Sequence, residues 1–412
     1  MSPSALDVLR SLHRATRGAA LPPPAALIGS WLGADAVIAP SLELVAGLAP
    51  PDRPDRYWLG HLSFPVDVAE AAFPAVAGGL TDSVLMLRDG EWEFHDVTGA
   101  PAPDWVAAAL SPSGHPAIAE WAPRNRRVGT PPPPSGHQTS SSGHISAHWQ
   151  TPTPQRRDDH RRAVLNALDA IAAGEIYQAC ICTRLDGRLD GDPVDFFGTV
   201  AAATAPRKAA FLAGRWGTVA SFSPESFLDR RGDHVTSSPI KGTLPAAGDP
   251  RDLAMSVKDV AENVMIVDLV RNDLGRVAAI GTVSVPELLT VVGAPGVWHL
   301  VSTVGADLPD HVGNDALLAA TFPPASVTGT PKIRAAELIG EWERLPRGVY
   351  CGAIGVAGPD HALDLSVAIR TVEIDPDGAM RLGVGGGITI DSEPDREWQE
   401  CLDKAAAIVG AG

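Results

Sequence analysis

Strand-like runs alternate with amphipathic segments through the second half of the chain, and this alternation limits the folds open to it. Helical periodicity is predicted at about 157–173, 252–274, 313–321, 331–343 and 394–408. Strand-like runs lie around them, at 176–185, 209–213, 226–230, 277–285, 350–357, 363–372 and 380–390. Many strands mixed with helices that can cover them predict an α/β or α+β architecture with a substantial sheet.

The chain divides into three predicted parts. Residues 1–123 contain short strand-like pieces such as 57–62 and 83–87, but no chemical motif. Residues 124–156 are rich in Pro, Ser, Gly and His, which cannot bury enough apolar surface to order a core, so we expect a surface loop or linker. Residues 157–412 hold nearly all the residues that suggest chemistry.

Charge and cysteine usage narrow the class of function. A net charge of -16 repels phosphate backbones, which disfavours nucleic-acid binding, and means that an anionic substrate needs local cations. The four cysteines form no paired metal-ligand sets, so reduced thiols are expected. No uninterrupted apolar stretch indicates a signal peptide or a membrane span, so we expect a cytoplasmic protein.

A glycine-rich strand that runs into a charged helix is the most informative element. The strand carries Gly385 and Gly387, and glycines within a strand often mark the close approach of a ligand. In the helix that follows, Glu397, Glu400 and Lys404 have the spacing i, i+3, i+7, which places them on one face. A solvated charged face would explain an isolated helix of this kind. Next to the glycines, the pattern indicates one edge of a site for Mg²⁺ and a carboxylate.

Two further segments carry charged residues that the local pattern alone does not assign to a site. Glu262 lies in an otherwise apolar helix, where it either pairs with Lys258 or binds a metal. Lys241 precedes Gly242 and Thr243 at the end of a strand-like run, a setting usual for a solvated turn. If the fold brings them together, Glu262, Glu397 and Glu400 supply enough oxygen ligands for Mg²⁺.

The segment TFPPASVTGTPKIRAAELI is predicted to begin a helix. Thr330 has the character of an N-cap and Pro331 that of a first helical residue. The amide groups at the start of the helix, with Ser326, Thr328 and Lys332, predict an anion-binding corner.

Ten runs, taken together and in order, resemble the chorismate-utilising enzymes over about residues 157–410. This family includes anthranilate synthase component I, aminodeoxychorismate synthase component I, isochorismate synthase and salicylate synthase. The resembling runs include GEIYQACICTRL, SFSPESFL, SPIKGTLP, KDVAENVMIVDLVRNDLGRV, YCGAIGV, AIRTVEI and VGGGITIDSEPDREWQE. The resemblance implies a large two-sheet sandwich with outer helices, to which both halves of the chain contribute.

The resemblance also implies roles for individual residues. Glu262 and Glu400 match the positions that hold Mg²⁺, with Glu397 close to the ion or bound to it through water. Glu225 matches the general acid that helps the C4 hydroxyl of chorismate to leave. His299 is expected beside the ring and Ser326 near the enolpyruvyl group. Further substrate contacts are implied for Gly242, Thr243, Tyr350, Arg370, Gly385, Gly387 and Lys404.

Two positions discriminate between reactions within the family. Members that add water carry a lysine base at the position of Gln178, and glutamine cannot deprotonate water. Members that aminate C4 read PIKGT where Lys241 stands, and those that aminate C2 generally read PIAGT. The resemblance therefore implies nucleophilic attack by the Lys241 amine on ring C2, followed by addition of ammonia at C4.

The implied function is the synthesis of 4-amino-4-deoxychorismate from chorismate and ammonia, for 4-aminobenzoate and folate. Because no cysteine lies in a nucleophile elbow, ammonia is expected from a glutamine amidotransferase subunit in trans. Two alternatives remain at this point: anthranilate synthase component I, and a catalytically silent member of the family that acts as a binding partner. A segment resembling the LLES run that often marks a tryptophan site is not found near the N-terminus.

Overall fold

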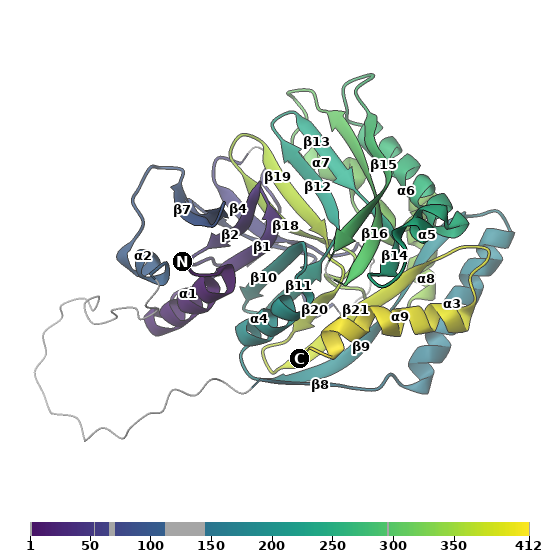
Figure 1. Ribbon diagram of the computed structural model, residues 1–412, viewed down its shortest axis with the longest axis horizontal. Helices are drawn as coiled ribbons and strands as arrows, with labels where there is room; N and C mark the ends of the chain where they lie inside the picture. Colours follow the sequence, from purple (N-terminus) through teal and green to yellow (C-terminus); the bar gives the residue numbers. More distant parts are fainter. Residues whose placement is uncertain (1, 53, 66–70, 112–144, 295, 412) are drawn as a thin grey trace, which may run out of the picture.

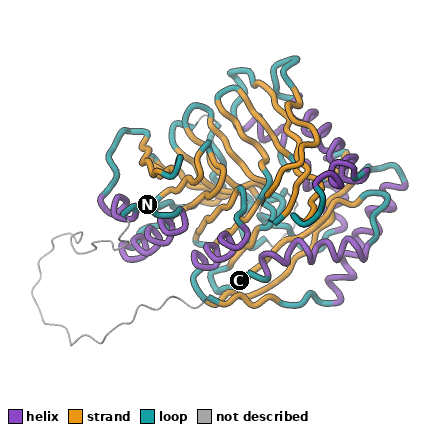
Figure 2. The backbone as a smooth tube through the Cα atoms, in the orientation of Figure 1, coloured by secondary structure: helices purple, strands orange, loops and turns teal. Residues whose placement is uncertain are grey.

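Two antiparallel sheets form the centre of the molecule. The computed structural model describes residues 2–52, 54–65, 71–111, 145–294 and 296–411. In this part of the chain, sheet A has eleven strands and sheet B has ten. Figure 2 shows the strands in the interior and the helices at the periphery. The predicted two-sheet sandwich with outer helices is present.

Sheet A joins strands from both halves of the chain. Its order is β17 (Gly329–Thr330), β9 (Gln178–Asp190), β21 (Ala379–Ile388), β20 (Thr371–Ile374), β11 (Gly217–Ser223), β10 (Lys208–Gly214), β1 (Ala25–Trp31), β2 (Ala34–Ala39), β6 (Ser83–Arg88) and β7 (Glu91–Asp96), with β8 (Ser146–Trp149) paired to β9.

Sheet B also joins strands from both halves of the chain. Its order is β14 (Ile240–Pro245), β16 (Val297–Asp307), β13 (His234–Ser238), β12 (Ser226–Arg231), β19 (Ala362–Val367), β18 (Ala353–Gly358), β4 (Tyr57–Leu62), β5 (Val76–Thr81) and β3 (Val45–Ala46), with β15 (Ser284–Ala294) paired to β16. The residues before position 100 therefore add strands to both sheets.

Helices cover the outer face of each sheet (Figure 1). They are α1 (Ala5–Ala19), α2 (Asp104–Ala109), α3 (Pro154–Ala172), α4 (Pro193–Thr204), α5 (Pro250–Met255), α6 (Val257–Gly275), α7 (Asn314–Thr321), α8 (Lys332–Trp342) and α9 (Pro394–Val409). One apolar cluster joins α1, α4 and α9 to sheet A, and a second joins α6 and α7 to sheet B. A third fills the space between the sheets, where Leu27 and Trp31 meet Leu59 and Ile354.

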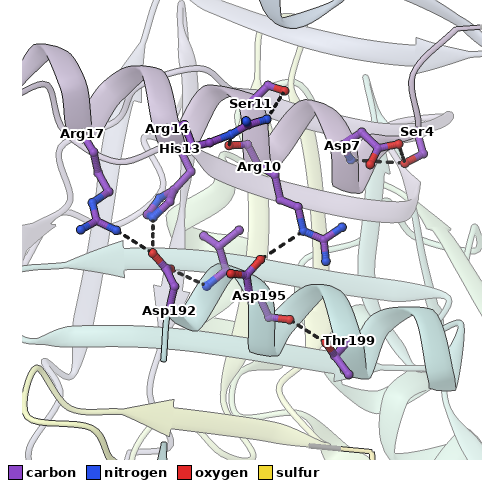
Figure 3. A network of polar contacts seen from close by, with 11 residues as sticks. Ser4, Asp7, Arg10, Ser11, His13, Arg14, Arg17, Asp192, Asp195 and Thr199 are labelled. Carbon is purple, nitrogen blue, oxygen red and sulfur yellow. Dashed lines mark hydrogen bonds and ion pairs between the residues drawn. The ribbon is translucent and has the colours of Figure 1, made fainter. Parts of the chain in front are cut away.

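A polar network fastens the N-terminal helix to the rest of the fold (Figure 3). Arg17 and His13 of α1 lie 2.8 Å and 3.0 Å from Asp192, the N-cap of α4, and Arg10 lies 3.3 Å from Asp195. The pairs are partly exposed, so each contributes little stability alone. They fix where α1 lies rather than adding much to the free energy of folding.

The structure differs from the sequence predictions at several element boundaries. The helix predicted at 252–274 is two helices, because Ser256 ends α5 and caps α6 by accepting a hydrogen bond from the amide of Asp259. The strand predicted at 277–285 is wrong, since β15 begins at Ser284. The strand predicted at 363–372 is broken into β19 and β20 around Arg370, whose φ is +51°.

The predicted loop at 124–156 lies mostly outside the described residues. Its last part, from residue 145, is described and contains β8 and the start of α3. None of the described helices is long and apolar enough to span a bilayer.

Candidate active site

The glycine strand β21 lies directly against α9. A Cβ built on Gly386 would lie 3.2 Å from Glu397 Oε2 and 3.5 Å from Glu400 Oε1. Lys404 Nζ donates to the carbonyl of Gly385 at 2.9 Å and lies 2.7 Å from Glu400 Oε1. A side chain at Gly386 would lie against these carboxylates. The three charged residues of α9 thus share one face, turned towards β21.

The next residue of β21 faces Lys241 and Gln178. A Cβ on Gly387 would meet Gln178 Nε2 at 2.3 Å and Lys241 Nζ at 3.3 Å. Lys241 comes from β14 of sheet B, whereas Gln178 begins β9 of sheet A. Gln178 is buried, and its Oε1 has no hydrogen-bond partner among the described residues. The two positions that distinguish reactions within the family therefore lie over the same glycine.

Glu262 and Glu397 share one cation, the Lys258 ammonium. Lys258 Nζ lies 3.9 Å from an oxygen of each carboxylate. Glu262 Oε1 is buried without a hydrogen-bond partner in the described chain, and burial raises the pKa of Glu262. Burial also raises the pKa of Glu400, but the charge and hydrogen bond of Lys404 outweigh it, and the net pKa is lowered.

These carboxylates suit Mg²⁺ by donor type, because Mg²⁺ prefers oxygen ligands and keeps several waters. Within the described residues, no set of three metal-binding side chains is already gathered around one point. Lys258 stands where a cation is needed between Glu262 and Glu397. A magnesium ion between Glu262 and Glu397 would have to displace this ammonium, with Glu400 close by on α9.

Glu225 is a buried acid beside the lysine. It follows β11, where its amide donates to Ser223 Oγ at 3.2 Å and its carbonyl accepts from the amide of Val367 at 3.1 Å. Burial raises the pKa of Glu225 from 4.5 to about 7, although a hydrogen bond with Ser326 and the charge of Lys241 act to lower it. A carboxyl with this pKa can hold and release a proton near neutral pH, as a general acid must.

His299 and Thr243 face each other across two strands of sheet B. They are register partners on β16 and β14, and Thr243 Oγ1 lies 3.0 Å from His299 Nδ1. Burial, with the charge of Arg370, lowers the pKa of His299 to about 4, so the ring is neutral at neutral pH. Its Nε2 has no partner within the described chain. Gly242, at φ +83°, lies at an irregularity in the pairing of β14 with β16, between Lys241 and Thr243.

Arg370 is a guanidinium without a counter-ion. Burial lowers its pKa, and no carboxylate of the described residues forms an ion pair with it. A partly buried cation of this kind is stabilised by an anionic ligand, which fits a substrate carboxylate.

Tyr350 lies against the face of β21 that also carries Gly387, further along the strand. A Cβ on Gly383 would be 2.2 Å from Tyr350 Cγ, so the ring packs directly on the glycine strand. Tyr350 also lines a cavity of about 730 Å³ at the edge of sheet A, whereas Lys241, Glu225 and Arg370 do not. The cavity adjoins the candidate site but is not its centre.

The segment before α8 differs from its prediction. Lys332 Nζ donates to Asp273 Oδ2 and to the carbonyls of Thr321 and Pro323, at 2.5, 2.7 and 2.9 Å, so it has no donor left for a ligand. Thr330 is not an N-cap, because it belongs to β17. Lys332 therefore cannot contribute to the predicted anion-binding corner, and the hydroxyl of Ser326 bonds the Glu225 carboxyl.

Comparisons with known proteins identify the family. Residues 45–410 match the family described as chorismate binding enzyme. Aminodeoxychorismate synthase component 1 of Salmonella typhimurium is 43% identical over 244 residues, which cover 58% of this chain and 54% of that protein. Anthranilate synthase component 1 of Thermus thermophilus is 36% identical over 313 residues, 74% of this chain and 66% of that protein. The chain thus spans little more than half the length of the Salmonella relative.

A solved structure supports the fold. Anthranilate synthase component I from Streptococcus pneumoniae superimposes with a TM-score of 0.66 at 21% identity, covering 94% of this chain and 90% of that one. Together, the fold and the family match define the class of protein, that of the chorismate binding enzymes. The chain belongs to the chorismate binding enzyme family.

Proposed function

We propose that this chain acts as an aminodeoxychorismate synthase component I, which converts chorismate and ammonia into 4-amino-4-deoxychorismate. The observation that carries the proposal is the setting of Lys241. The chain has five lysines. Four of them have a carboxylate oxygen within 4 Å, at distances between 2.5 and 3.9 Å. Lys241 forms no such pair in the described part of the chain, and an amine that attacks carbon must be free of its proton.

The reaction we propose has two displacement steps. The Lys241 amine adds to ring C2, the ring double bonds shift, and the C4 hydroxyl leaves as water with a proton from Glu225. Ammonia then adds at C4, the double bonds shift back, and the bond from C2 to Lys241 breaks, which restores the amine. Buried Glu225 suits the first step because its pKa, about 7, leaves it protonated in part of the molecules at neutral pH.

Other residues of the chain would bind and orient the substrate. The unpaired Arg370 guanidinium fits one carboxylate, and the neutral His299, held by Thr243, fits beside the ring. Glu262, Glu397 and Glu400 would hold Mg²⁺, which would neutralise the charge of a substrate carboxylate when bound. In a chain of net charge -16, these local cations give an anion a place to bind.

We further propose that ammonia comes from a glutamine amidotransferase subunit in trans, and that the enzyme acts in the cytoplasm. The product would supply 4-aminobenzoate and folate synthesis after another enzyme removes pyruvate. Names of relatives that call the protein component 1 support a partner subunit.

A second candidate is amination at C2, as in an anthranilate synthase component I. The relative of that name in Thermus thermophilus favours it, because the match covers more of this chain than the Salmonella match does. Lys241 disfavours it, since direct attack of ammonia at C2 leaves the lysine without a role.

Product analysis separates these candidates. The purified chain is incubated with chorismate, Mg²⁺ and an ammonium salt at mildly alkaline pH, and products are identified by mass and fluorescence. We expect 4-amino-4-deoxychorismate; anthranilate would refute the C4 assignment, and unchanged chorismate would favour a silent family member.

Two variants test the covalent role of the lysine. Lys241→Ala removes both the amine and the charge, whereas Lys241→Arg keeps the charge that acts on Glu225 but provides no nucleophile. Both should lose most aminodeoxychorismate formation while remaining folded. An active Lys241→Arg would show that the residue acts through its charge alone. Because the chain has only five lysines, mass spectrometry of peptides can locate a trapped adduct directly.

A further inference from the structure

A buried ion pair at the edge of sheet A replaces the backbone pairing of β9. Strand β17 pairs with β9 at Gln178 and Ala179, and one more bond joins the amide of Cys180 to Thr328 at 2.8 Å. Beyond this point two side chains continue the pairing. Arg347 Nη2 donates to the carbonyl of Cys180 at 2.7 Å. Glu343 Oε1 accepts from the amide of Cys182 at 2.8 Å.

The same arginine also reaches the turn that carries Ser326. Arg347 Nη1 donates to the carbonyl of Val327 at 2.8 Å, and its Nε and Nη2 bind the two oxygens of Glu343 at 2.8 Å and 2.7 Å. Both side chains are almost fully buried, 2% and 6% exposed. One planar guanidinium thus joins β9 to the 3₁₀ turn Ala325–Val327.

This geometry indicates a role beyond stability. A buried ion pair often contributes little net free energy, because desolvation of both charges offsets their attraction. The planar guanidinium of Arg347, with its fork of N–H donors, instead fixes the spacing between two groups of the candidate site. On one side is β9, with Gln178 over Gly387; on the other is Ser326, which bonds the Glu225 carboxyl.

We propose that Arg347, held by Glu343, is a positioning residue that sets the turn against β9 and so keeps the Ser326 hydroxyl on the Glu225 carboxyl. The proposal rests on the proposed function in one respect, the assignment of Glu225 as the acid. Arg347 touches neither substrate nor reacting atoms. Its effect passes through Val327 and Ser326.

The pH dependence of chorismate consumption tests this role. The Ser326 hydrogen bond lowers the pKa of Glu225, so its loss raises that pKa, and the activity of an enzyme that needs protonated Glu225 then extends to higher pH. Arg347→Ala should lower kcat roughly 100-fold, because misplacement by about 1 Å has that order of effect, with KM little changed. In the pH–activity profile of this variant, the alkaline limb should move to higher pH, to the position found for Ser326→Ala.

A double variant and a rescue experiment sharpen the test. Arg347→Ala combined with Ser326→Ala should shift the limb no further than either change alone, because both act through one hydrogen bond. Arg347 lines the 730 Å³ cavity, so ethylguanidinium can enter and should restore part of the activity, whereas ethylammonium at equal concentration should not. Arg184→Ala is the matched control. Arg184 lines the same cavity, but its side chain binds Asp186 on its own strand, so its loss should leave the limb in place.

A measurement without chorismate separates this inference from the proposed function. ¹³C NMR of carboxyl-labelled glutamate, assigned with Glu225→Gln, follows the titration of Glu225 directly in the ligand-free protein. Ser326→Ala and Arg347→Ala should raise its midpoint together, even if the chain produced no aminodeoxychorismate. A midpoint, or an alkaline limb, unchanged in Arg347→Ala but moved in Ser326→Ala would overturn the proposal, as would additive shifts. If Arg347→Ala does not fold, Arg347→Lys, which keeps the charge but not the fork, is judged by the same two outcomes.

Discussion

Replacement of Glu225 by glutamine isolates the free energy of keeping a carboxyl in the interior. Glu225 is 4% exposed, and burial raises its pKa from 4.5 to about 7. In the unfolded chain the group ionises near its ordinary value, so between these two pH values the folded state binds more protons than the unfolded state. The stability of the wild type therefore falls as pH rises through this window. The gap corresponds to about 3 kcal/mol above pH 7, because one pH unit equals about 1.4 kcal/mol.

Glutamine is neutral throughout and lacks this dependence. The difference in free energy of unfolding between Glu225→Gln and the wild type should thus move in favour of the variant by up to about 3 kcal/mol between about pH 5 and about pH 8. Urea unfolding of both proteins across this range measures it, and any constant effect of the substitution cancels in the comparison. Glu341→Gln, on the exposed surface of α8, is the control. A difference that stays constant with pH would refute the reasoning that burial holds Glu225 protonated.

Three further predictions concern single polar or charged side chains. Lys258→Met removes the ammonium between two buried carboxylates, so Mg²⁺ should raise the melting temperature of this variant more than that of the wild type in thermal-shift assays; equal shifts would count against a shared cation site. Lys208→Met leaves the buried charge of Asp364 without its main partner, and urea unfolding should show a loss of about 3–5 kcal/mol, of which Lys208→Met with Asp364→Leu recovers a large part. Gln178→Glu places a carboxylate over the glycine that Lys241 faces, so aminodeoxychorismate formation should collapse while circular dichroism and melting temperature change little; retained activity would contradict the need for an unpaired amine.

Local patterns predicted the elements well where no distant partner decides the backbone. The spacing of Glu397, Glu400 and Lys404 placed them on one face of a helix, and that face lies on β21 as expected. Thr330 shows the limit of such reasoning. Its residue type suits an N-cap, but pairing of β17 with Gln178, 152 positions earlier in the chain, fixes its backbone as a strand.

Positions around Arg370 were missed for a related reason. The run 363–372 alternates like a single strand, and only the tertiary structure requires a left-handed residue within it. At Ser256 the opposite holds: a serine before an apolar run is a recognisable N-cap, so the break between α5 and α6 was open to prediction from the sequence.

The residues of the candidate site come together through strand pairings between segments that are distant in the sequence. No local sequence pattern contains these pairings. β21 pairs with β9 over ten successive residues, from Ala379 opposite Arg188 to Ile388 opposite Ala179. This register brings Gln178 next to Gly387, and the packing of sheet B against sheet A then adds Lys241 from β14. A slip of one residue would turn the face with Gly387 towards α9 and separate this glycine from Gln178 and Lys241. The alternation of the glycines in β21 therefore does more than make room for a ligand. It turns Gly386 towards the carboxylates of α9 and Gly387 towards Gln178 and Lys241, so that two parts of the candidate site meet along one strand.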